Sequence, residues 1–149
     1  ARLEHARCFT NHGAAHIWVS AADGSWTHGA QRAWKKIPVT DANKQRMMGR
    51  LKERGLPTAF KVEFPFAETK PSFEIAFGLP SGEVWLQYSR ANDAEAMRYA
   101  VFGADGKYLR DVTVPASVEL KGFGASGAAY GITKEADGRR GLVRLTPAP

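Results

Sequence analysis

The segment YAVFGADGKYL, residues 99–109, holds two strand-like runs separated by a turn. The runs at 97–102 and 108–114 are rich in aromatic and β-branched side chains, which favour strands. Ala104-Asp105-Gly106 between them carries the Asp-Gly pair of a two-residue hairpin turn, in which glycine adopts positive φ without a clash. The segment therefore predicts an antiparallel hairpin.

The same turn chemistry recurs along the chain. Ala-Asp-Gly occupies residues 22–24, 104–106 and 136–138, and Ser81-Gly82 takes an equivalent place before a further strand-like run. Short strands between such turns favour propeller-type blades or a meandering sandwich, so we predict a mainly β chain of about two to three antiparallel blades. The candidate strands are residues 16–20, 60–64, 73–77, 84–89, 97–102, 108–114, 117–120, 128–133 and 142–145.

One short amphipathic helix is predicted over residues 40–55. Thr40 can cap it, Asp41 suits the positive end of its dipole, and Gly55 followed by Pro57 ends it. The narrow apolar stripe of this helix consists of Met47, Met48 and Leu51.

Composition bounds the class of protein. The chain has 149 residues, 44% hydrophobic and 24% charged, which is typical of one globular domain. A helix that crosses a membrane needs roughly 18 or more consecutive apolar residues, and the sequence has no such run. Cys8 is the single cysteine, so no intrachain disulfide can form and packing must stabilise the fold.

The positive charge is local. The net charge of +6 arises within residues 32–54, where eight cations stand against two carboxylates. Such a segment can neutralise phosphates, with Trp34 as a stacking surface, which makes nucleic acid or another anionic surface the alternative partner. However, the helical positions of Lys44, Arg46, Arg50 and Arg54 spread widely, as solvated charges do. The candidate anion-binding residues are Lys35, Lys36, Lys44, Arg46, Arg50, Lys52 and Arg54.

The N-terminal segment offers the donors of a metal site. His5, Cys8, His12 and His16 supply imidazole and thiolate groups, which are zinc ligands. Structural zinc sites usually pair Cys-x-x-Cys with a second ligand pair after a longer gap, and that pattern is missing here. The alternative interpretation is a frayed terminus with incidental histidines.

Two further patterns suggest chemistry at first sight. Residues 122–127 read GFGASG and match the glycine spacing of a dinucleotide site, but a strand-like run follows them where a helix is required. We interpret them as a glycine-rich hairpin connection. Ser126 lacks the Gly-x-Ser-x-Gly elbow of a hydrolase nucleophile, so we predict no catalytic residue.

Six motifs follow one another from residue 37 onward: IPVTD (37–41), FPFAETKPSF (64–73), GEVWL (82–86), YAVFGADGKYL (99–109), VTVP (112–115) and AYGI (129–132). With these motifs, residues 32–145 resemble the C-terminal part of a family of bacterial six-bladed β-propeller proteins. The resemblance implies that Trp85 and Phe102 fill the space between neighbouring blades, and it favours an extracytoplasmic location. Propeller hydrolases of the lactonase kind hold calcium at the central channel, which makes a metal-dependent hydrolase the alternative function. Its candidate ligands are Glu63, Glu68, Glu74, Asn92 and Asp93.

The chain is shorter than the resemblance to a six-bladed propeller implies. Six blades of about 40 residues each need far more than 149 residues. We expect a partial chain, a shortened relative or half of an assembly, with open strand edges that favour self-association. We divide the chain into an N-terminal segment with one strand (1–31), a basic linker and helix (32–58) and propeller-type blades (59–149), together one structural domain.

The function predicted from these patterns is a non-catalytic, propeller-type scaffold that binds a ligand or a protein. No cofactor is predicted, with calcium or zinc as the alternative.

Overall fold

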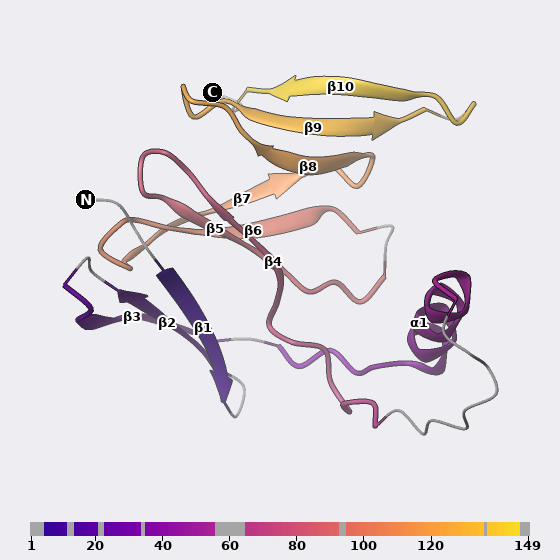
Figure 1. Cartoon of the computed structure of the whole chain (residues 1–149), viewed down its shortest axis with the longest axis horizontal. Coiled ribbons are helices and arrows are strands. Elements are labelled where there is room, and N and C mark those ends of the chain that lie inside the picture. Colours follow the sequence, from indigo (N-terminus) through magenta and orange to yellow (C-terminus); the bar gives the residue numbers. More distant parts are fainter. Residues whose placement is uncertain are drawn as a thin grey trace. The chain divides into compact units, whose positions relative to one another are not determined.

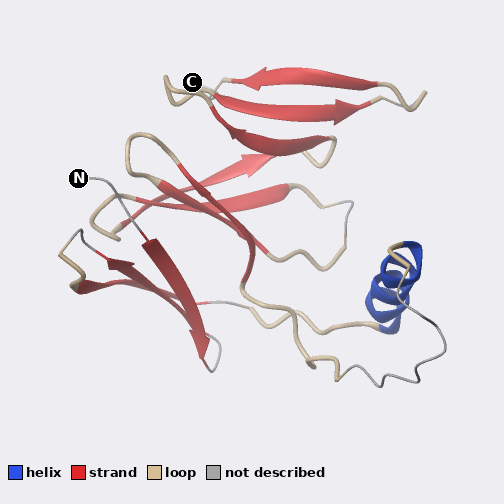
Figure 2. Ribbon diagram, viewed as in Figure 1, coloured by secondary structure: helices blue, strands red, loops and turns tan. Residues whose placement is uncertain are grey.

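The computed structural model describes residues 5–11, 14–20, 23–33, 35–55, 65–92, 95–135 and 137–146. Within these ranges the chain is mainly β, with antiparallel strands and one helix, which confirms the predicted fold class (Figure 2). In chain order the elements are β1 (His5–Asn11), β2 (Ala14–Ser20), β3 (Trp26–Ala33), α1 (Asp41–Glu53), β4 (Phe73–Gly78), β5 (Val84–Tyr88), β6 (Met97–Phe102), β7 (Tyr108–Val114), β8 (Val118–Phe123), β9 (Ala129–Lys134) and β10 (Arg140–Leu145), as labelled in Figure 1.

Among the described residues, the strands form three antiparallel sheets. Their orders are β1-β2-β3, β4-β5-β6-β7 and β8-β9-β10, so each strand pairs with its neighbours in sequence and each sheet is a meander. The predicted strands from residue 73 onward all correspond to observed strands, while the candidate strand at 60–64 lies outside the described residues. Strands β1 and β3 were not expected from the sequence, which indicated a strand only at 16–20 in this region.

Four hairpin turns among the described residues share one hydrogen-bond pattern, but they are not the predicted two-residue turns. In the turn at residues 103–107, the amide of Gly103 donates to the carbonyl of Lys107 at 2.9 Å, and the amide of Gly106 donates to the carbonyl of Gly103 at 2.9 Å. Gly106 has φ +76°. This is a three-residue loop with glycine in the left-handed third position. The same pattern is found at 79–83, 124–128 and 135–139.

The chain divides into two compact units, residues 1–35 with 71–149, and residues 36–70. In the smaller unit, Thr40 begins α1 through a capping box: the Thr40 hydroxyl accepts from the Asn43 amide at 3.3 Å, and the Asn43 side chain accepts from the Thr40 amide at 3.1 Å. Within the predicted apolar stripe, Met47 is 49% exposed, whereas Met48 and Leu51 are half-buried.

The main apolar core lies between the sheet β4–β7 and the sheet β8–β10. Trp85, Tyr99 and Val101 from the first sheet form one cluster with Val118 and Leu120 from the second. The rings of Phe77 and Trp85 also contact Phe123 at the end of β8. The two sheets therefore share one core.

The central strands of the sheet β4–β7 are also buried on their other face. Val84, Leu86, Ala100 and Phe102 form a second apolar cluster there. Ala100 and its neighbour Val101 belong to opposite faces, because side chains alternate along a strand, and both are 0% exposed. Strands β5 and β6 are thus covered on both sides, as in a sheet stacked inside a layered structure.

Candidate functional site

The predicted metal ligands fall on the first hairpin. His5 and Cys8 lie in β1 and His16 lies in β2, where Cys8 is opposite Ile17 and His16 is opposite Phe9. The structure describes only the backbone at these three positions, and His12 lies outside the described residues. In the part of the chain that is described, no group of three or more metal-ligating side chains comes together. A zinc site at the N-terminal segment stays a prediction.

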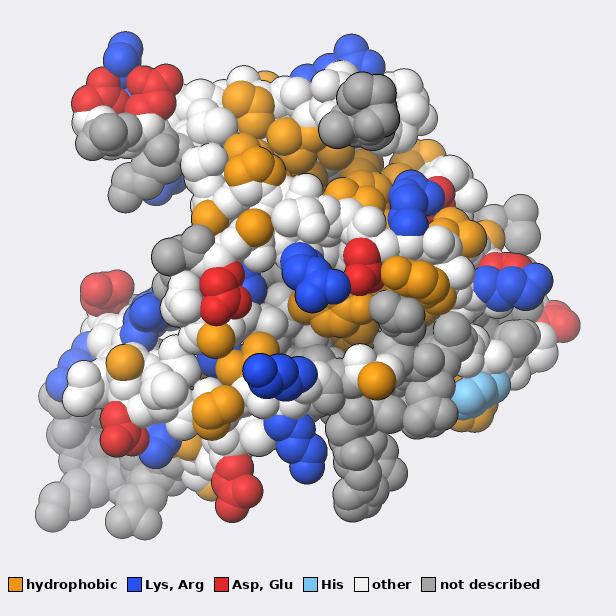
Figure 3. Space-filling view, turned by 180° about the vertical axis from the view of Figure 1, so that it is seen from behind, with side chains coloured by type: hydrophobic (Ala, Val, Ile, Leu, Met, Phe, Trp, Pro, Cys, Tyr) orange, Lys and Arg blue, Asp and Glu red, His pale blue; other side chains and the backbone are white. Residues whose placement is uncertain are grey.

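The predicted anion-binding residues are placed on α1 and the segment before it. Lys35 and Lys36 precede the helix and are exposed. Lys44 is half-buried, and its ammonium contacts the Asp41 carboxylate at 2.9 Å. Arg46, Arg50, Lys52 and Arg54 are exposed. On the face of the molecule drawn in Figure 3, lysine and arginine side chains are interspersed with aspartate and glutamate, so positive charge does not form a continuous patch there.

In the described part of the chain, Glu68 and Glu74, two of the residues considered for a calcium site, belong to no group of three or more side chains that could hold a metal ion. Glu63 and Asp93 lie outside the described residues. The Glu68 carbonyl accepts from the Val39 amide at 2.9 Å, Glu74 is an exposed residue of β4, and Asn92 donates to the Glu95 carboxylate at 2.9 Å. The calcium site stays a prediction.

Residues 122–127 form a hairpin, as interpreted from the sequence. They contain the end of β8 and the turn at 124–128, and β9 follows directly. Gly127 has φ +79°, the left-handed conformation of the third loop position. No helix begins here, so the segment has the context of a hairpin and not of a dinucleotide site.

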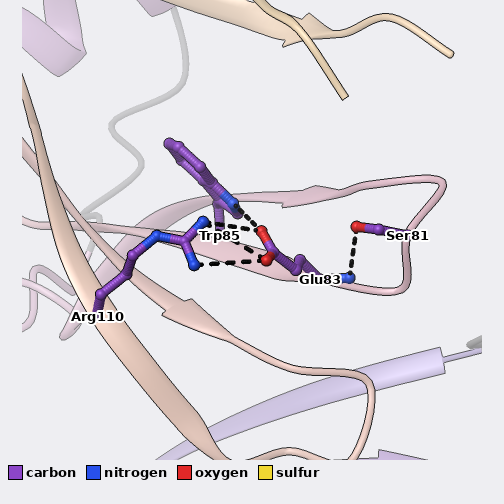
Figure 4. A network of polar contacts seen from close by, with 4 residues as sticks. All are labelled: Ser81, Glu83, Trp85 and Arg110. Carbon is purple, nitrogen blue, oxygen red and sulfur yellow. Dashed lines mark hydrogen bonds and ion pairs between the residues drawn. The ribbon is translucent and has the colours of Figure 1, made fainter. Parts of the chain in front are cut away.

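A polar network that the sequence patterns do not indicate surrounds the Glu83 carboxylate, just before β5 (Figure 4). The Trp85 indole Nε1 donates to Glu83 Oε2 at 3.2 Å, and Arg110 Nη2 on β7 contacts the same oxygen at 3.2 Å. Strand β6 lies between β5 and β7, with Val101 opposite both Trp85 and Arg110. The ion pair therefore spans β6 at the rim of the main core.

A second network lies on the opposite face of the same sheet. Asp111 Oδ2 contacts Arg98 Nη2 at 2.9 Å, and Asp111 Oδ1 accepts from the Tyr88 hydroxyl at 3.4 Å. The Arg98 guanidinium lies 5.5 Å from the centre of the Tyr88 ring, within the range of a cation–π contact. Arg110 and Asp111 are consecutive on β7, so their side chains lie on opposite faces of the sheet, and β7 contributes one ion pair to each face.

The core itself contains a buried hydrogen bond. The Tyr99 hydroxyl donates to Gln87 Oε1 at 3.0 Å, and both residues are buried. Burial raises the pKa of Tyr99 to about 12. The phenol therefore stays neutral at physiological pH and acts as a hydrogen-bond donor that satisfies Gln87, not as a base.

These networks hold the sheet together. Their acidic groups are each paired with a guanidinium. The Glu83–Arg110 pair reaches across β6 from the residue before β5 to β7, and the Asp111–Arg98 pair joins β7 to its neighbour β6. A local signal could have indicated them: Arg110-Asp111 places opposite charges on consecutive strand residues, which must face opposite sides. The partners of these two residues depend on the register of three strands and have no local signal.

Comparison of the chain with protein-family models, with curated proteins and with solved structures finds no match.

Proposed function

We propose that this chain is a propeller-type β scaffold that binds a ligand or a protein and carries out no chemistry of its own. The observation that carries the proposal is the two-sided burial of β5 and β6, the central strands of the sheet β4–β7. A propeller stacks four-stranded meanders around an axis, so each blade has a neighbour on both faces. Trp85 and Phe102, which the family resemblance assigns to the space between blades, lie in the two opposite clusters and are 9% and 1% exposed.

The polar groups of this sheet support a scaffold. One ion pair lies on each face of the sheet, Glu83–Arg110 on one and Asp111–Arg98 on the other. A buried hydrogen bond joins Tyr99 to Gln87 within the sheet. Two of its hairpin turns, at 79–83 and 103–107, lie at the same end of the meander, because alternate connections return to the same end. The exposed loop residues Ser81, Ala104 and Asp105 at this end are the surface that we propose for contacts with a ligand or partner.

In the described part of the chain no helix is both long and apolar enough to cross a membrane.

The two-sided burial is tested by two variants at consecutive positions. Ala100→Asp and Val101→Asp each place a charge in one of the two apolar clusters. In a stacked blade both lower the free energy of unfolding by several kcal/mol, about 3 or more, because an unpaired charge is buried on either face. The measurement is urea unfolding followed by tryptophan fluorescence.

The control for these variants is Thr113→Asp, at an exposed position on β7, which is expected to change stability little. If Ala100→Asp is as mild as this control, that face is open to solvent, and the blade-like stacking is wrong.

A further inference from the structure

Strand β10 is an open edge of the sheet β8–β10. Among the described strands it pairs with β9 alone (Figure 1). Every second residue of an edge strand turns its backbone N–H and C=O groups away from the neighbouring strand, and these groups can pair with another chain. The edge of β10 is therefore a place where an extended peptide can add to the sheet as a further strand.

The turn before β10 shows which residues face this edge. The Glu135 amide donates to the Arg139 carbonyl at 2.9 Å, so positions 135 and 139 form a hydrogen-bonded pair. Bonded and non-bonded pairs alternate along an antiparallel ladder, and the register of β9 and β10 continues from this turn without a shift. The residues of β10 whose N–H and C=O groups face the open edge are therefore Arg140, Leu142 and Arg144.

The side chains of the same three residues share the outer face of the sheet. Val143 and Leu145 pack against the main core, and side chains alternate along a strand, so Arg140, Leu142 and Arg144 lie on the opposite face. All three are exposed, Leu142 at 75%. We call Arg140 and Arg144 the outer arginines. An added strand thus meets an apolar side chain between two guanidinium groups.

The outer arginines have no carboxylate partner in their own sheet. Residues 118–146 contain five cations and three carboxylates, and each of the three carboxylates contacts another cation. Glu119 contacts Lys121, while Glu135 and Asp137 both contact Arg139, at 3.2 and 2.6 Å. Neither outer arginine forms an ion pair with a described residue. The positive charge at this edge is therefore left for a partner.

The neighbouring strand does not supply that charge either. On β9 the residues opposite the outer arginines are Lys134 and Tyr130, and Ile132 lies opposite Leu142. Opposite charges stabilise a cross-strand pair, and apolar side chains stabilise each other in the same way. The strand that complements β10 on its open side therefore has a carboxylate, an apolar residue and a second carboxylate at alternate positions.

A second copy of the chain does not provide such a strand. Antiparallel pairing of two β10 strands about Leu142 places Arg140 of each opposite Arg144 of the other, and like charges directly opposite are destabilising. No two carboxylates in the sequence are four residues apart, so no other segment of the chain has the required pattern. The same charges that disfavour a second copy therefore favour an acidic partner.

We propose that β10 binds, by antiparallel strand addition, an extended peptide of a partner protein with two carboxylates four residues apart and an apolar residue midway between them. Backbone hydrogen bonds along β10 supply affinity, and the outer arginines and Leu142 select the side chains. The site goes beyond the proposed scaffold function, because it is separate from the loops at 79–83 and 103–107. It requires the sheet β8–β10 to be folded, and it holds or fails independently of any contact at those loops.

The test is fluorescence anisotropy of the full chain with the labelled heptapeptide Thr-Glu-Thr-Val-Thr-Glu-Thr, at roughly 50 mM salt, where charge pairs are little screened. The variant with Arg140→Gln and Arg144→Gln is expected to bind it about tenfold more weakly, because each exposed cross-strand charge pair contributes about threefold. The parent chain is expected to show the same loss with a peptide that has glutamine in place of both glutamates.

A matched control removes the same charge elsewhere. The variant with Arg50→Gln and Lys52→Gln loses two exposed cations of α1, in the smaller unit, and is expected to keep its affinity within about twofold. Urea midpoints verify that both variants are folded. Because all four side chains are exposed, the midpoints are expected to match that of the parent chain.

Two modified peptides test the backbone of the edge. An N-methyl group on the valine removes the amide that faces Leu142 and is expected to weaken binding by about tenfold or more. An N-methyl group on the threonine before it lies on the far side of the added strand and is expected to change affinity by less than about threefold. In NMR hydrogen exchange of the chain, the unmodified peptide is expected to slow the amides of Arg140, Leu142 and Arg144.

Several outcomes overturn the proposal. Absence of peptide binding at the low salt concentration rules out the site. An equal loss of affinity in the α1 control means that net charge alone attracts the peptide. Equal affinities of the two N-methyl peptides place the peptide on the face of the sheet and not at its edge. A stable dimer of the parent chain, with the amide of Leu142 already protected from exchange, assigns the edge to a second copy.

Discussion

The indole of Trp85 and the ring of Phe123 meet edge to face, with their centroids 4.8 Å apart. Trp85 belongs to β5 and Phe123 ends β8, so the contact joins two sheets of the larger unit. Phe77 and Tyr99 surround the same pair. Such aromatic contacts add to the free energy of apolar burial, and they tie the unfolding of the two sheets together.

Phe123→Ala is expected to lower the free energy of unfolding by about 3 kcal/mol, the lower end for core Phe-to-Ala changes, because Phe123 is only partly buried. Urea unfolding followed by tryptophan fluorescence measures the change. Leu142→Ala is the matched control, since Leu142 is 75% exposed and its truncation leaves no cavity. Equal effects from the two variants would show that the Trp85–Phe123 contact does not join the sheets.

The Tyr99–Gln87 hydrogen bond gives a second prediction. Tyr99→Phe leaves Gln87 Oε1 buried without its donor and is expected to cost about 1–3 kcal/mol. Replacing Gln87 by Leu in the same chain removes the unpaired acceptor and is expected to restore a large part of the loss. If the double variant is as unstable as the sum of the two single variants, the hydrogen bond is not coupled as the structure indicates.

The raised pKa of Tyr99 predicts loss of stability in alkali. The pKa rises from 10.0 to about 12 in the folded chain, chiefly because burial disfavours the phenolate. The unfolded chain therefore releases this proton first, and the contribution is complete below pH 10 and is lost as pH rises towards about 12. Unfolding free energies at a series of pH values measure this slope. The slope is expected to be smaller in Tyr99→Phe than in the control Tyr108→Phe, and equal slopes would contradict the assignment.

Much of the fold was predictable because its signals are local. Strands β6 and β7 follow from their apolar runs and from the Ala104-Asp105-Gly106 turn between them. The type of turn could not be predicted from the sequence, because an Asp-Gly pair alone indicates a two-residue loop. The additional loop residue, Ala104 here, becomes part of the turn only when the hydrogen bond of Gly103 to Lys107 is seen.

Other elements depend on contacts between distant residues. Strands β1 and β3 are rich in polar residues, and their pairing with β2 gives them a strand conformation that their composition does not indicate. The Glu83–Arg110 pair joins residues 27 positions apart and follows from the register of three strands.

The left-handed backbone conformation of Gly106 in the turn at 103–107 can be tested by substitution. Gly106→Ala is expected to lower the free energy of unfolding by about 1–2 kcal/mol, because an L-residue side chain is strained at φ +76°. Gly106→Asn is expected to cost less, since asparagine tolerates the left-handed region better. Gly78→Ala is the control, because Gly78 lies in β4 without positive φ and has open space where the methyl group of alanine would lie. Equal costs at positions 106 and 78 would contradict the left-handed turn.

The open edge of β4 leads to a prediction about assembly. Among the described strands, β4 pairs with β5 alone, and Ile75 on β4 is 45% exposed. An unpaired strand edge is a template for a second chain, so we expect weak, concentration-dependent self-association. Glu74 opposes it, because it places an exposed charge at the irregular register between Phe73 and Ile75, and both a charge and a bulge limit edge pairing.

Glu74→Val is therefore expected to strengthen the association by about tenfold in its dissociation constant, since one charge-for-apolar exchange at an edge changes the free energy by roughly 1.4 kcal/mol. Light scattering over a range of concentrations measures the mass relative to the 16.3 kDa of the chain. Glu135→Val makes the same exchange in the hairpin turn at 135–139 and is expected to leave the mass unchanged. A monomer mass for the parent chain and for Glu74→Val at every concentration would show that the β4 edge does not pair with a second copy.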